Sequence, residues 1–364
     1  MSPGADDFRY MARALRLARR GLQTTTPNPR VGCVLVNDGQ IVGEGWHERS
    51  GGPHAEVVAL ENAGARAANA TAYVSLEPCA HHGRTPPCAD ALIGARVGRV
   101  VSAMRDPNPQ VSGKGFEALR QAGIVVEVGV LENEARELNL GFVSRMQRGR
   151  PWVRLKMAAS LDGKTALANN VSKWITGPDA RRDGHRWRAL SCAVVTGIGT
   201  LRDDDPLLTV RDVPTTRQPL RVVVDSRLRI EPDARILGGG PVLVATATRD
   251  PAKATVLQSK GAELVELPNA EGKVDLAHLM AHLGGRGINE VLVEAGVNLN
   301  SALLQAGVVD ELVMYFAPHL LGHGARGMLD LGLLADMAQR LPLDILDTRR
   351  FGPDTRIVAR IARP

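Results

Sequence analysis

Two series of short apolar segments, with helical segments between them, run along this chain, and the polar sequence Gln-Arg-Gly-Arg-Pro at residues 147–151 separates them. Alternation of strand and helix is typical of α/β domains. Glycine, proline and basic residues in one short segment are typical of a linker between folded segments. The length of 364 residues also exceeds that of one ordinary domain. We therefore predict an α/β fold in two domains, residues 1–148 and 149–364.

The first half begins with a helix and a hairpin. Apolar residues at helical spacing predict a helix over residues 6–20, which Gly21 ends. Two apolar runs flank Asn-Asp-Gly-Gln at residues 37–40, a hairpin signature because its glycine tolerates positive φ. A helix over residues 54–68, a strand over 72–76, a helix after 88 and a strand over 99–103 complete an α/β unit, and a charged helical stretch follows over 132–146.

The second half contains six apolar runs but lacks a nucleotide-binding fingerprint. The runs are residues 152–158, 193–197, 220–225, 242–247, 290–294 and 311–317. Gly-Ile-Gly-Thr at residues 197–200 follows a predicted strand, yet the third glycine of the dinucleotide-binding fingerprint is missing. Polar side chains nevertheless collect where predicted strands end, and ligands of open α/β sheets bind at such ends.

The composition restricts the partners of this protein. Aromatic residues make up only 3% of the chain, too few for the stacking surface that single-stranded nucleic acid needs, so we expect no nucleic-acid partner. The formal net charge of +6 suits an anionic ligand, but the basic residues are scattered rather than clustered. A phosphorylated small molecule is an anionic ligand that does not need a continuous basic surface.

The N-terminal segment and the cysteines predict a cytoplasmic protein. Residues 1–21 lack the apolar core of a signal peptide, and no later stretch approaches the ~18 apolar residues of a membrane span, so we expect no membrane partner. The cysteines are Cys33, Cys79, Cys88 and Cys192, too few for a disulfide framework. Two closely spaced thiols in a reducing compartment instead indicate metal binding or chemistry.

Three residues of the first half form a candidate metal site. His54 opens a predicted helix, Cys79 follows a predicted strand, and Cys88 begins a helix after Thr-Pro-Pro. One imidazole and two thiolates suit Zn²⁺, and three protein ligands leave a fourth position for the water of a catalytic site. Alone, the cysteines could be core residues or half of a structural zinc site. Their order and context favour the catalytic interpretation.

Glu56 lies two residues beyond His54 and is the candidate acid/base. From the start of the helix it can face a bound water without displacing it. One carboxylate there can take a proton from water, deliver it to a ring nitrogen and later protonate the departing ammonia. His81 and His82 lie between the cysteines and could be alternative ligands, but we interpret them as loop residues because three ligands are already present.

The spacing of the cysteines differs from the general cytidine deaminase signature. That signature has two residues between its cysteines, whereas eight separate Cys79 from Cys88. The longer loop resembles the deaminase half of the bifunctional riboflavin-biosynthesis deaminase/reductases. Supporting matches are Thr-Pro-Asn-Pro-Arg-Val-Gly at residues 26–32, Gly-Trp-His at 45–47, Gly-Pro-His-Ala-Glu at 52–56 and Asp-Pro-Asn-Pro at 106–109.

This resemblance implies a cytidine-deaminase-like α/β/α first domain that binds a phosphorylated pyrimidine. The implied substrate contacts are Asn28, His47, Arg84, Asp106 and Asn108. Arg84 suits a ribose phosphate because a guanidinium group offers a fixed fork of donors. Taken singly, Asn28, Asp106 and Asn108 lie beside prolines and could simply form turns, and Arg84 could be a solvated charge.

The resemblance extends over the second half, where residues 156–164, 172–177, 199–211 and 294–296 carry it. It implies a dihydrofolate-reductase-like α/β domain that binds NADPH without the Rossmann glycines. The implied NADPH contacts are Ala158, Trp174, Thr200, Asp204, Ser226, Gly296, Val297, Asn298, Leu299, Asn300, Ser301 and Ala302, and the implied substrate contacts are Ser172, Arg188, Leu208, Arg211 and Glu294. Lys156 is a further candidate, since an ammonium group near the ribose could assist opening to the imine that accepts hydride.

We therefore predict a zinc-dependent deaminase joined to an NADPH-dependent reductase. It deaminates the diaminopyrimidine ribosylamino phosphate of early riboflavin biosynthesis and then reduces the ribosyl group to ribityl. One alternative is a nucleoside or tRNA deaminase with an unrelated appended domain, and another is a deaminase whose second domain only senses a dinucleotide. We also expect a homo-oligomer, a dimer or a tetramer, although the residues do not choose between them.

Overall fold

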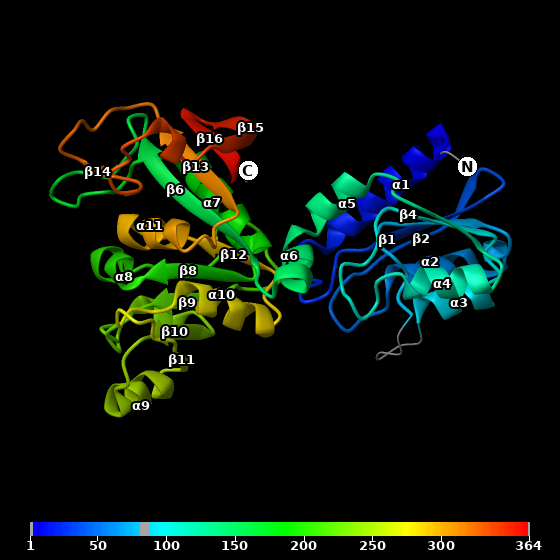
Figure 1. Cartoon of the computed structure of the whole chain (residues 1–364), viewed down its shortest axis with the longest axis horizontal. Helices are drawn as coiled ribbons and strands as arrows, with labels where there is room; N and C mark the ends of the chain where they lie inside the picture. The colour runs from blue at the N-terminus through cyan, green and yellow to red at the C-terminus, as the bar shows by residue number, and fades with distance from the viewer. Residues whose placement is uncertain (1–2, 81–86, 363–364) are drawn as a thin grey trace. The chain divides into compact units, whose positions relative to one another are not determined.

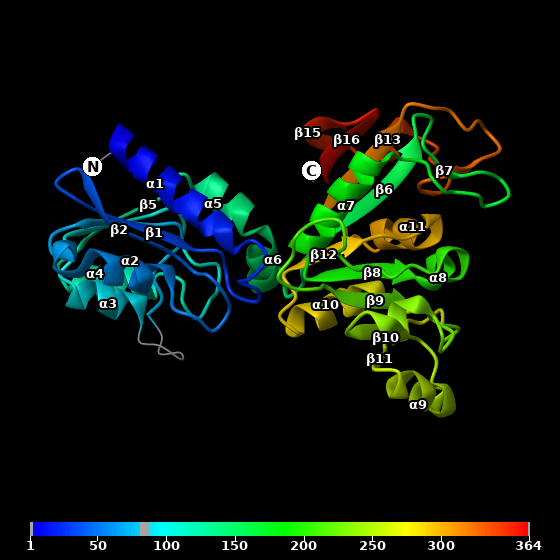
Figure 2. The same ribbon diagram turned by 180° about the vertical axis from the view of Figure 1, so that it is seen from behind.

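The computed structural model describes residues 3–80 and 87–362. The chain divides into two compact units, Met1–Gly149 (unit 1) and Arg150–Pro364 (unit 2), shown from two sides in Figure 1 and Figure 2. Both units combine helices with a β-sheet, as the alternating apolar segments predict. None of the helices within the described ranges has both the length and the apolar character needed to cross a membrane.

Unit 1 is a sheet with helices on both faces. Its elements are α1 (Ala5–Ala18), β1 (Gly32–Asn37), β2 (Gln40–Trp46), α2 (Ala55–Ala63), β3 (Thr71–Val74), α3 (Cys88–Gly94), β4 (Arg99–Ser102), α4 (Lys114–Gln121), β5 (Val125–Val128), α5 (Glu132–Leu138) and α6 (Leu140–Arg148). The strand order is β2-β1-β3-β4-β5, with β1 antiparallel to both neighbours and the others parallel. Helices α1, α5 and α6 share one apolar core with the sheet, and α2, α3 and α4 share the other (Figure 1).

The predicted hairpin of unit 1 is confirmed, and two predicted helices differ in extent. The hairpin turns at Asp38 and Gly39, whose φ angles are 47° and 74°. Helix α2 ends at Ala63, earlier than predicted. The stretch over 132–146 forms two helices that meet at Asn139, because this buried side chain hydrogen-bonds both the N–H and the C=O of Arg30. Helix α4 and strand β5 were not predicted.

Helix α2 lies unusually close to strand β2. Its alanines at positions 55, 59 and 63 form one buried face, and Gly43 and Gly45 lie opposite on the strand. A Cβ at Gly43 would meet the carbonyl oxygen of Ala59 at 2.2 Å, and one at Gly45 would meet that of Ala55 at 2.3 Å. Glycine is therefore required at both positions, and this contact fixes the start of α2 against the sheet.

Unit 2 is built on one nine-stranded sheet. Its elements are β6 (Trp152–Ser160), β7 (Lys164–Ala166), α7 (Pro178–Leu190), β8 (Ala193–Gly197), α8 (Ile198–Asp204), β9 (Leu220–Val224), β10 (Val242–Thr246), α9 (Pro251–Ser259), β11 (Ala262–Glu266), α10 (Leu276–Gly285), β12 (Glu290–Val293), α11 (Val297–Gln305), β13 (Glu311–Ala317), β14 (Arg326–Gly327), β15 (Leu343–Phe351) and β16 (Asp354–Ile361). All six predicted strands are confirmed, and β7, β11, β14, β15 and β16 were not predicted.

The sheet of unit 2 has the order β11-β10-β9-β8-β12-β6-β13-β16-β15. Strands β11 to β13 are parallel to one another, and β15 and β16 add an antiparallel hairpin at one edge. Strand β12 ends at Val293, opposite Leu155, whereas β6 continues to Ser160 beside β13 alone. Among the described strands, the second half of β6 therefore has a paired neighbour only on the β13 side, and its other side lies next to the carboxyl end of β12.

Candidate active sites

The three predicted metal ligands of unit 1 lie together. His54 caps the start of α2, Cys79 follows β3, and Cys88 is the first residue of α3. Their ligand atoms all lie within 4.8 Å of one another. The Nδ1 atom of His54 is 3.2 Å from Cys88 Sγ and 3.6 Å from Cys79 Sγ. Three elements that are distant in sequence thus bring one imidazole and two thiols to a single point.

The chemistry of this donor set fits zinc. A hydrogen bond from the Cys88 thiol and the neighbouring His54 lower the pKa of Cys79 to about 4, so this sulfur is a thiolate at neutral pH. Thiolate and imidazole are the ligands that zinc prefers, and a set of three leaves one position open. His81 and His82, the alternative ligands of the sequence analysis, lie outside the described residues, as does Arg84.

Glu56 is placed beside the metal ligands but offers no atom to their cluster. It is the second residue of α2, its side chain is buried, and it lines the same pocket as His54 and Cys79. Burial is the main cause that raises the pKa of Glu56 to about 7. A carboxyl group with this pKa exchanges protons readily near neutral pH, as a general acid/base must.

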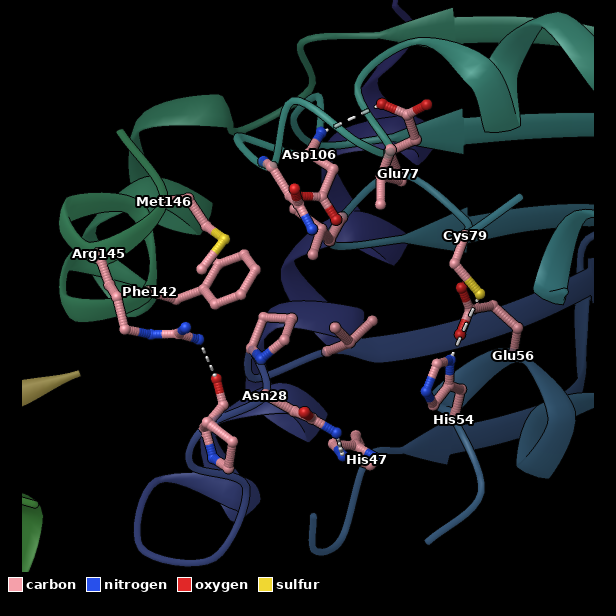
Figure 3. A pocket seen from close by; sticks show the side chains of 16 residues that line it. Asn28, His47, His54, Glu56, Glu77, Cys79, Asp106, Phe142, Arg145 and Met146 are labelled. Carbon is pink, nitrogen blue, oxygen red and sulfur yellow. Dashed lines mark hydrogen bonds between the residues drawn. The ribbon is translucent and has the colours of Figure 1, made fainter. Parts of the chain in front are cut away.

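A cavity of about 300 Å³ extends from the metal ligands across unit 1 (Figure 3). This volume lies at the lower end of the range for small-molecule sites. Four of the five predicted substrate contacts line it, and the fifth, Arg84, is outside the described residues. The lining residues are Pro27, Asn28, Pro29, Val31, His47, His54, Glu56, Leu76, Glu77, Cys79, Asp106, Asn108, Val111, Phe142, Arg145 and Met146.

Asn28 and His47 hold each other in the wall of this cavity. His47 Nδ1 is 2.9 Å from the carbonyl oxygen of Pro53, which can only accept, so Nδ1 carries the proton. His47 Nε2 then accepts a hydrogen bond of 3.1 Å from the side-chain amide of Asn28. Burial lowers the pKa of His47, which keeps the ring neutral. Because Pro53 precedes His54, these contacts also position the metal-ligand loop.

Asp106 and Asn108 reach the cavity on a loop that Glu77 organises. The buried Glu77 carboxylate accepts hydrogen bonds from the backbone N–H groups of Asp106, Gly113 and Gly115, at 3.0–3.1 Å. Asp106 in turn accepts from the N–H of Asn108 at 2.8 Å. The turn interpretation therefore applies to Asp106 in part, since it forms a turn and lines the pocket. Sequence reasoning missed Glu77, although it lies two residues before Cys79.

Sequence reasoning also missed the wall that faces the metal ligands. Phe142, Arg145 and Met146 of α6 line the cavity on the side away from His54 and Cys79 (Figure 3). The spacing of 142, 145 and 146 is the ordinary spacing of one helical face, which looks the same whether that face meets a core or a ligand. The amphipathic pattern of this helix therefore contains no signal of a pocket.

In unit 2, the predicted cofactor contacts lie near the carboxyl ends of neighbouring parallel strands. Thr200 lies in α8, directly after β8, Ser226 follows β9, and Gly296 follows β12. Parallel strands end at the same edge of a sheet, so these positions share one edge, the usual ligand-binding edge of such sheets. Ala158 lies on the part of β6 that has no β12 neighbour.

The start of helix α11 carries most of the remaining predicted cofactor contacts. Its N-cap is Gly296, and no described side chain caps it. Ser301 Oγ bonds to the carbonyl of Val297 at 2.7 Å. Asn300 is buried, and its Oδ1 has no hydrogen-bond partner within the described ranges. Uncapped N–H groups at a helix start suit a phosphate, and an orphan buried acceptor is typical of a site that another group completes, so this edge fits NADPH.

Asp204 pairs with Lys173, the residue that precedes Trp174. Asp204 ends α8, and its carboxylate oxygen lies 3.1 Å from the Lys173 ammonium group. Trp174 is 70% exposed, and the guanidinium of Arg181 lies 4.5 Å from its ring centroid. Ser172 is half-buried two residues earlier. Their contacts with cofactor or substrate stay predictions.

Lys156, Arg188 and Glu294 form a charged cluster in unit 2. Arg188 donates two hydrogen bonds to the Glu294 carboxylate, at 2.5 and 3.0 Å, and their side chains are 14% and 13% exposed. The charges of Arg188 and Lys156 outweigh burial and hold the pKa of Glu294 at about 2. Burial lowers the pKa of Lys156, against the opposing effect of Glu294. The structure thus brings together three residues that lie far apart in the sequence.

Hydrogen bonds with helix α7 fix two positions of the loop that carries Leu208 and Arg211. Arg188 donates to the carbonyl of Thr209 at 3.0 Å, and the N–H of Arg211 donates to His185 Nδ1 at 3.2 Å. The side chain of Arg211 is exposed, whereas Leu208 is buried in the core, and the substrate contact predicted for each stays a prediction. His185 was not among the predicted residues, because a single histidine on a helix carries no signal of what it contacts.

Comparison with known proteins gives the same two-part division. The family model described as the cytidine and deoxycytidylate deaminase zinc-binding region matches residues 5–104, and the RibD C-terminal domain matches residues 151–357. The chain is 50% identical to the riboflavin biosynthesis protein RibD of Escherichia coli (strain K12) over 361 residues, which cover 96% of this chain and 97% of the relative. It is 47% identical to RibD of Haemophilus influenzae, with 97% of each chain covered.

Two solved structures agree with these relatives. RibD of Acinetobacter baumannii, form 1, superposes with a TM-score of 0.91 at 47% identity and covers 98% of this chain and 99% of its own. A diaminohydroxyphosphoribosylaminopyrimidine deaminase/5-amino-6-(5-phosphoribosylamino)uracil reductase from Thermotoga maritima superposes with a TM-score of 0.86 at 35% identity, with 98% and 99% covered. Identity of this level over nearly the whole chain, together with the match of the RibD C-terminal domain over more than half of it, places the chain in the RibD family of riboflavin-biosynthesis proteins.

Proposed function

We propose that the chain catalyses two consecutive steps of riboflavin biosynthesis, with residues 1–148 as the deaminase and residues 149–364 as the reductase. The first step removes the exocyclic amine of the diaminopyrimidine ribosylamino phosphate, and the second reduces its ribosyl group to ribityl with NADPH. The convergence of His54, Cys79 and Cys88 beside the buried Glu56 is the observation that carries this proposal. It supplies a complete hydrolytic site in the unit whose family model is a zinc-binding deaminase region.

In the deaminase, His54, Cys79 and Cys88 would hold zinc, which would supply a water made nucleophilic at neutral pH. Glu56 accepts the proton of the attacking water, delivers it to the ring nitrogen and then protonates the leaving amine. Its pKa of about 7 suits both directions of transfer. Asn28, His47, Asp106 and Asn108 orient the pyrimidine ring, with Arg84 on its phosphate.

In the reductase, NADPH supplies a hydride. We assign its binding to Ala158, Trp174, Thr200, Asp204, Ser226 and residues 296–302, with the start of α11 receiving a phosphate. Lys156 lies beside Glu294 at the substrate end and assists opening of the ribose to the imine. Ser172, Arg188, Leu208, Arg211 and Glu294 contact the substrate.

The proposal is tested by giving the purified protein the diaminopyrimidine ribosylamino phosphate with and without NADPH. We expect ammonia release in both cases and a fall in NADPH absorbance only after deamination. Activity on nucleosides or tRNA with indifference to NADPH would support an unrelated appended domain. NADPH binding without oxidation would support a second domain that only senses the cofactor.

We propose that the chain acts in the cytoplasm on this small molecule, without a nucleic-acid partner, as a homo-oligomer. Cys33, Cys79 and Cys88 form no disulfide, as is expected in a reducing compartment. Strand β15 lies at the edge of the sheet with Leu343, Ile345 and Leu346 exposed by 38–65%, and an exposed apolar edge strand favours pairing with a second copy. Ile345→Lys should convert the oligomer to monomers in sedimentation experiments, and an unchanged mass would place the interface elsewhere.

A further inference from the structure

Arg145 occupies a distinctive place in the deaminase cavity. It lies on α6, beside Phe142 and Met146, on the side of the cavity away from the metal ligands (Figure 3). Its guanidinium carbon is 5.8 Å from the ring centroid of Phe142, and its Nη2 donates to the carbonyl oxygen of Pro27 at 2.8 Å. Two elements far apart in sequence therefore fix this side chain in the cavity wall.

The charges of the cavity are distributed unevenly. Glu56 and the metal ligands lie at one end, and Glu77 and Asp106 line the wall formed by the segments after β3 and β4. Among the described lining residues, Arg145 is the one arginine or lysine. A dianionic group is repelled by the carboxylates and attracted by a guanidinium, so the electrostatics of the described wall favour an anion near α6.

The chemistry of deamination fixes the other end of the substrate. The carbon that loses its amine must lie beside Glu56 and the metal ligands, and the ribose phosphate is the part of the molecule that extends away from that carbon. A cavity of about 300 Å³ that ends at α6 directs this extension toward Arg145. Helix α6 lies beyond residues 5–104, the part that matches the general deaminase region. The shared part thus supplies the reacting groups and contacts such as Asn28 and His47, and α6 adds a cationic group on the side of the cavity away from the metal ligands.

We propose that Arg145 binds the ribose phosphate of the deaminase substrate, in addition to the contact assigned to Arg84, so that α6 contributes to the selection of phosphorylated pyrimidines. This inference rests on the proposed function of unit 1. The hydrogen bond to Pro27 does not conflict with it, because a guanidinium has five N–H donors and keeps its charge while donating to a carbonyl. That bond also ties α6 to the loop that carries Asn28, so the test must separate phosphate binding from support of this loop.

The experiment compares Arg145→Gln and Arg145→Lys with wild type on two substrates, the phosphorylated compound and its dephosphorylated form. For Arg145→Gln we expect an apparent KM for the phosphorylated substrate raised roughly 10- to 150-fold, the range for losing a hydrogen bond to a charged group. The KM for the dephosphorylated form should stay within about twofold of wild type, as should zinc content. Arg145→Lys retains the charge and should recover part of the affinity.

Arg136→Gln on α5 is the matched control, because Arg136 is a half-buried arginine that pairs with Glu132 and is not among the residues that line the cavity. Its KM values should equal those of wild type. Equal damage to both substrates by Arg145→Gln would overturn the proposal, because support of the Pro27 loop acts regardless of phosphate. Should that variant fail to fold, an equal loss on both substrates in Arg145→Lys would overturn it in the same way. If the proposed function of unit 1 were wrong, the wild-type protein itself would release no ammonia from the phosphorylated substrate, which distinguishes that failure from failure of the Arg145 proposal.

Discussion

The two units of this chain present their sites in opposite ways. In unit 1 the reacting groups are few, chemically distinctive and fixed at the starts of α2 and α3, with Cys79 just beyond β3. In unit 2 the predicted contacts are distributed over the carboxyl ends of parallel strands and a loop, and two of the predicted residues, Arg188 and Glu294, form an ion pair with each other. A metal site can therefore be identified from its residue types, whereas a cofactor site at the edge of a sheet depends on where the parallel strands end.

The largest expected effect separates the two reactions at Glu56. Glu56→Gln removes the proton carrier while keeping the three metal ligands, so deamination should fall by about 10²-fold or more, the range for a positioned acid/base. Zinc content and NADPH-dependent reduction of the deaminated compound should stay unchanged. The measurements are ammonia release, metal analysis and NADPH absorbance. Undiminished ammonia release would show that another residue carries the proton.

Removing Glu294 from the charged cluster should lower both the stability of unit 2 and its reductase activity. Glu294→Ala leaves Arg188 and Lys156 without their counter-charge. Breaking a buried pair costs about 3–5 kcal/mol, and we expect about 3 kcal/mol because both side chains remain 13–14% exposed. Chemical denaturation should show this loss in the transition of unit 2, with reduction abolished and deamination kept. An unchanged transition would show that solvent already neutralises these charges.

The substrate contact predicted for Arg211 gives the next largest effect, because a guanidinium group can bind the phosphate of the substrate. Its side chain is exposed, so Arg211→Ala should disturb little besides binding. The apparent KM of reduction should rise roughly 10- to 150-fold, whereas deamination stays within about twofold because the mutated group belongs to unit 2. Each reaction is measured separately, with saturating NADPH for the second. Equal effects on both reactions would show that Arg211 is not a specific contact of the reductase substrate.

The smallest expected effect is the pH dependence of the loop that carries Arg211. His185 accepts the N–H of this residue through Nδ1 only while the ring is neutral. Burial and then Arg188 lower the pKa of His185 in the folded protein, so the unfolded state takes up the proton first. The stabilisation of the folded loop by neutral His185 is therefore complete above the pKa that His185 has in the unfolded state, about 6.5. It is lost as the pH falls through the lower pKa that His185 has in the folded protein.

The loss should amount to about 1 kcal/mol, the value of one hydrogen bond, and should raise the KM of reduction roughly fivefold on acidification. His185→Gln is the control, since its amide oxygen can accept from Arg211 at any pH. The comparison leaves the neighbouring charged residues unchanged. They are Asp212, which pairs with the His185 ring at 3.2 Å, Arg188, Arg211 and Glu294. A pH profile of KM identical in the variant and wild type would assign the dependence to another group.

The sequence by itself determined the two-part α/β organisation and the residues that converge at the metal site. His54, Cys79 and Cys88 could be identified because their residue types have few other uses at such spacing. The hairpin at residues 37–40 was equally clear, since its turn needs only local backbone conformation. Much of the remaining site prediction came from family resemblance, and local patterns would not have separated Asn28 or Asp106 from ordinary turn residues.

Only the tertiary structure decided what surrounds these residues. The sequence could not show that Glu77 ties the Asp106 loop to the metal-ligand segment, that α6 closes the cavity with Arg145, or that His185 holds the Arg211 loop. A local pattern reports whether a side chain faces the solvent or the interior, not which distant segment it meets there. Those partners are chosen by packing between elements that lie tens of residues apart, and this packing turned separate motifs into a pocket.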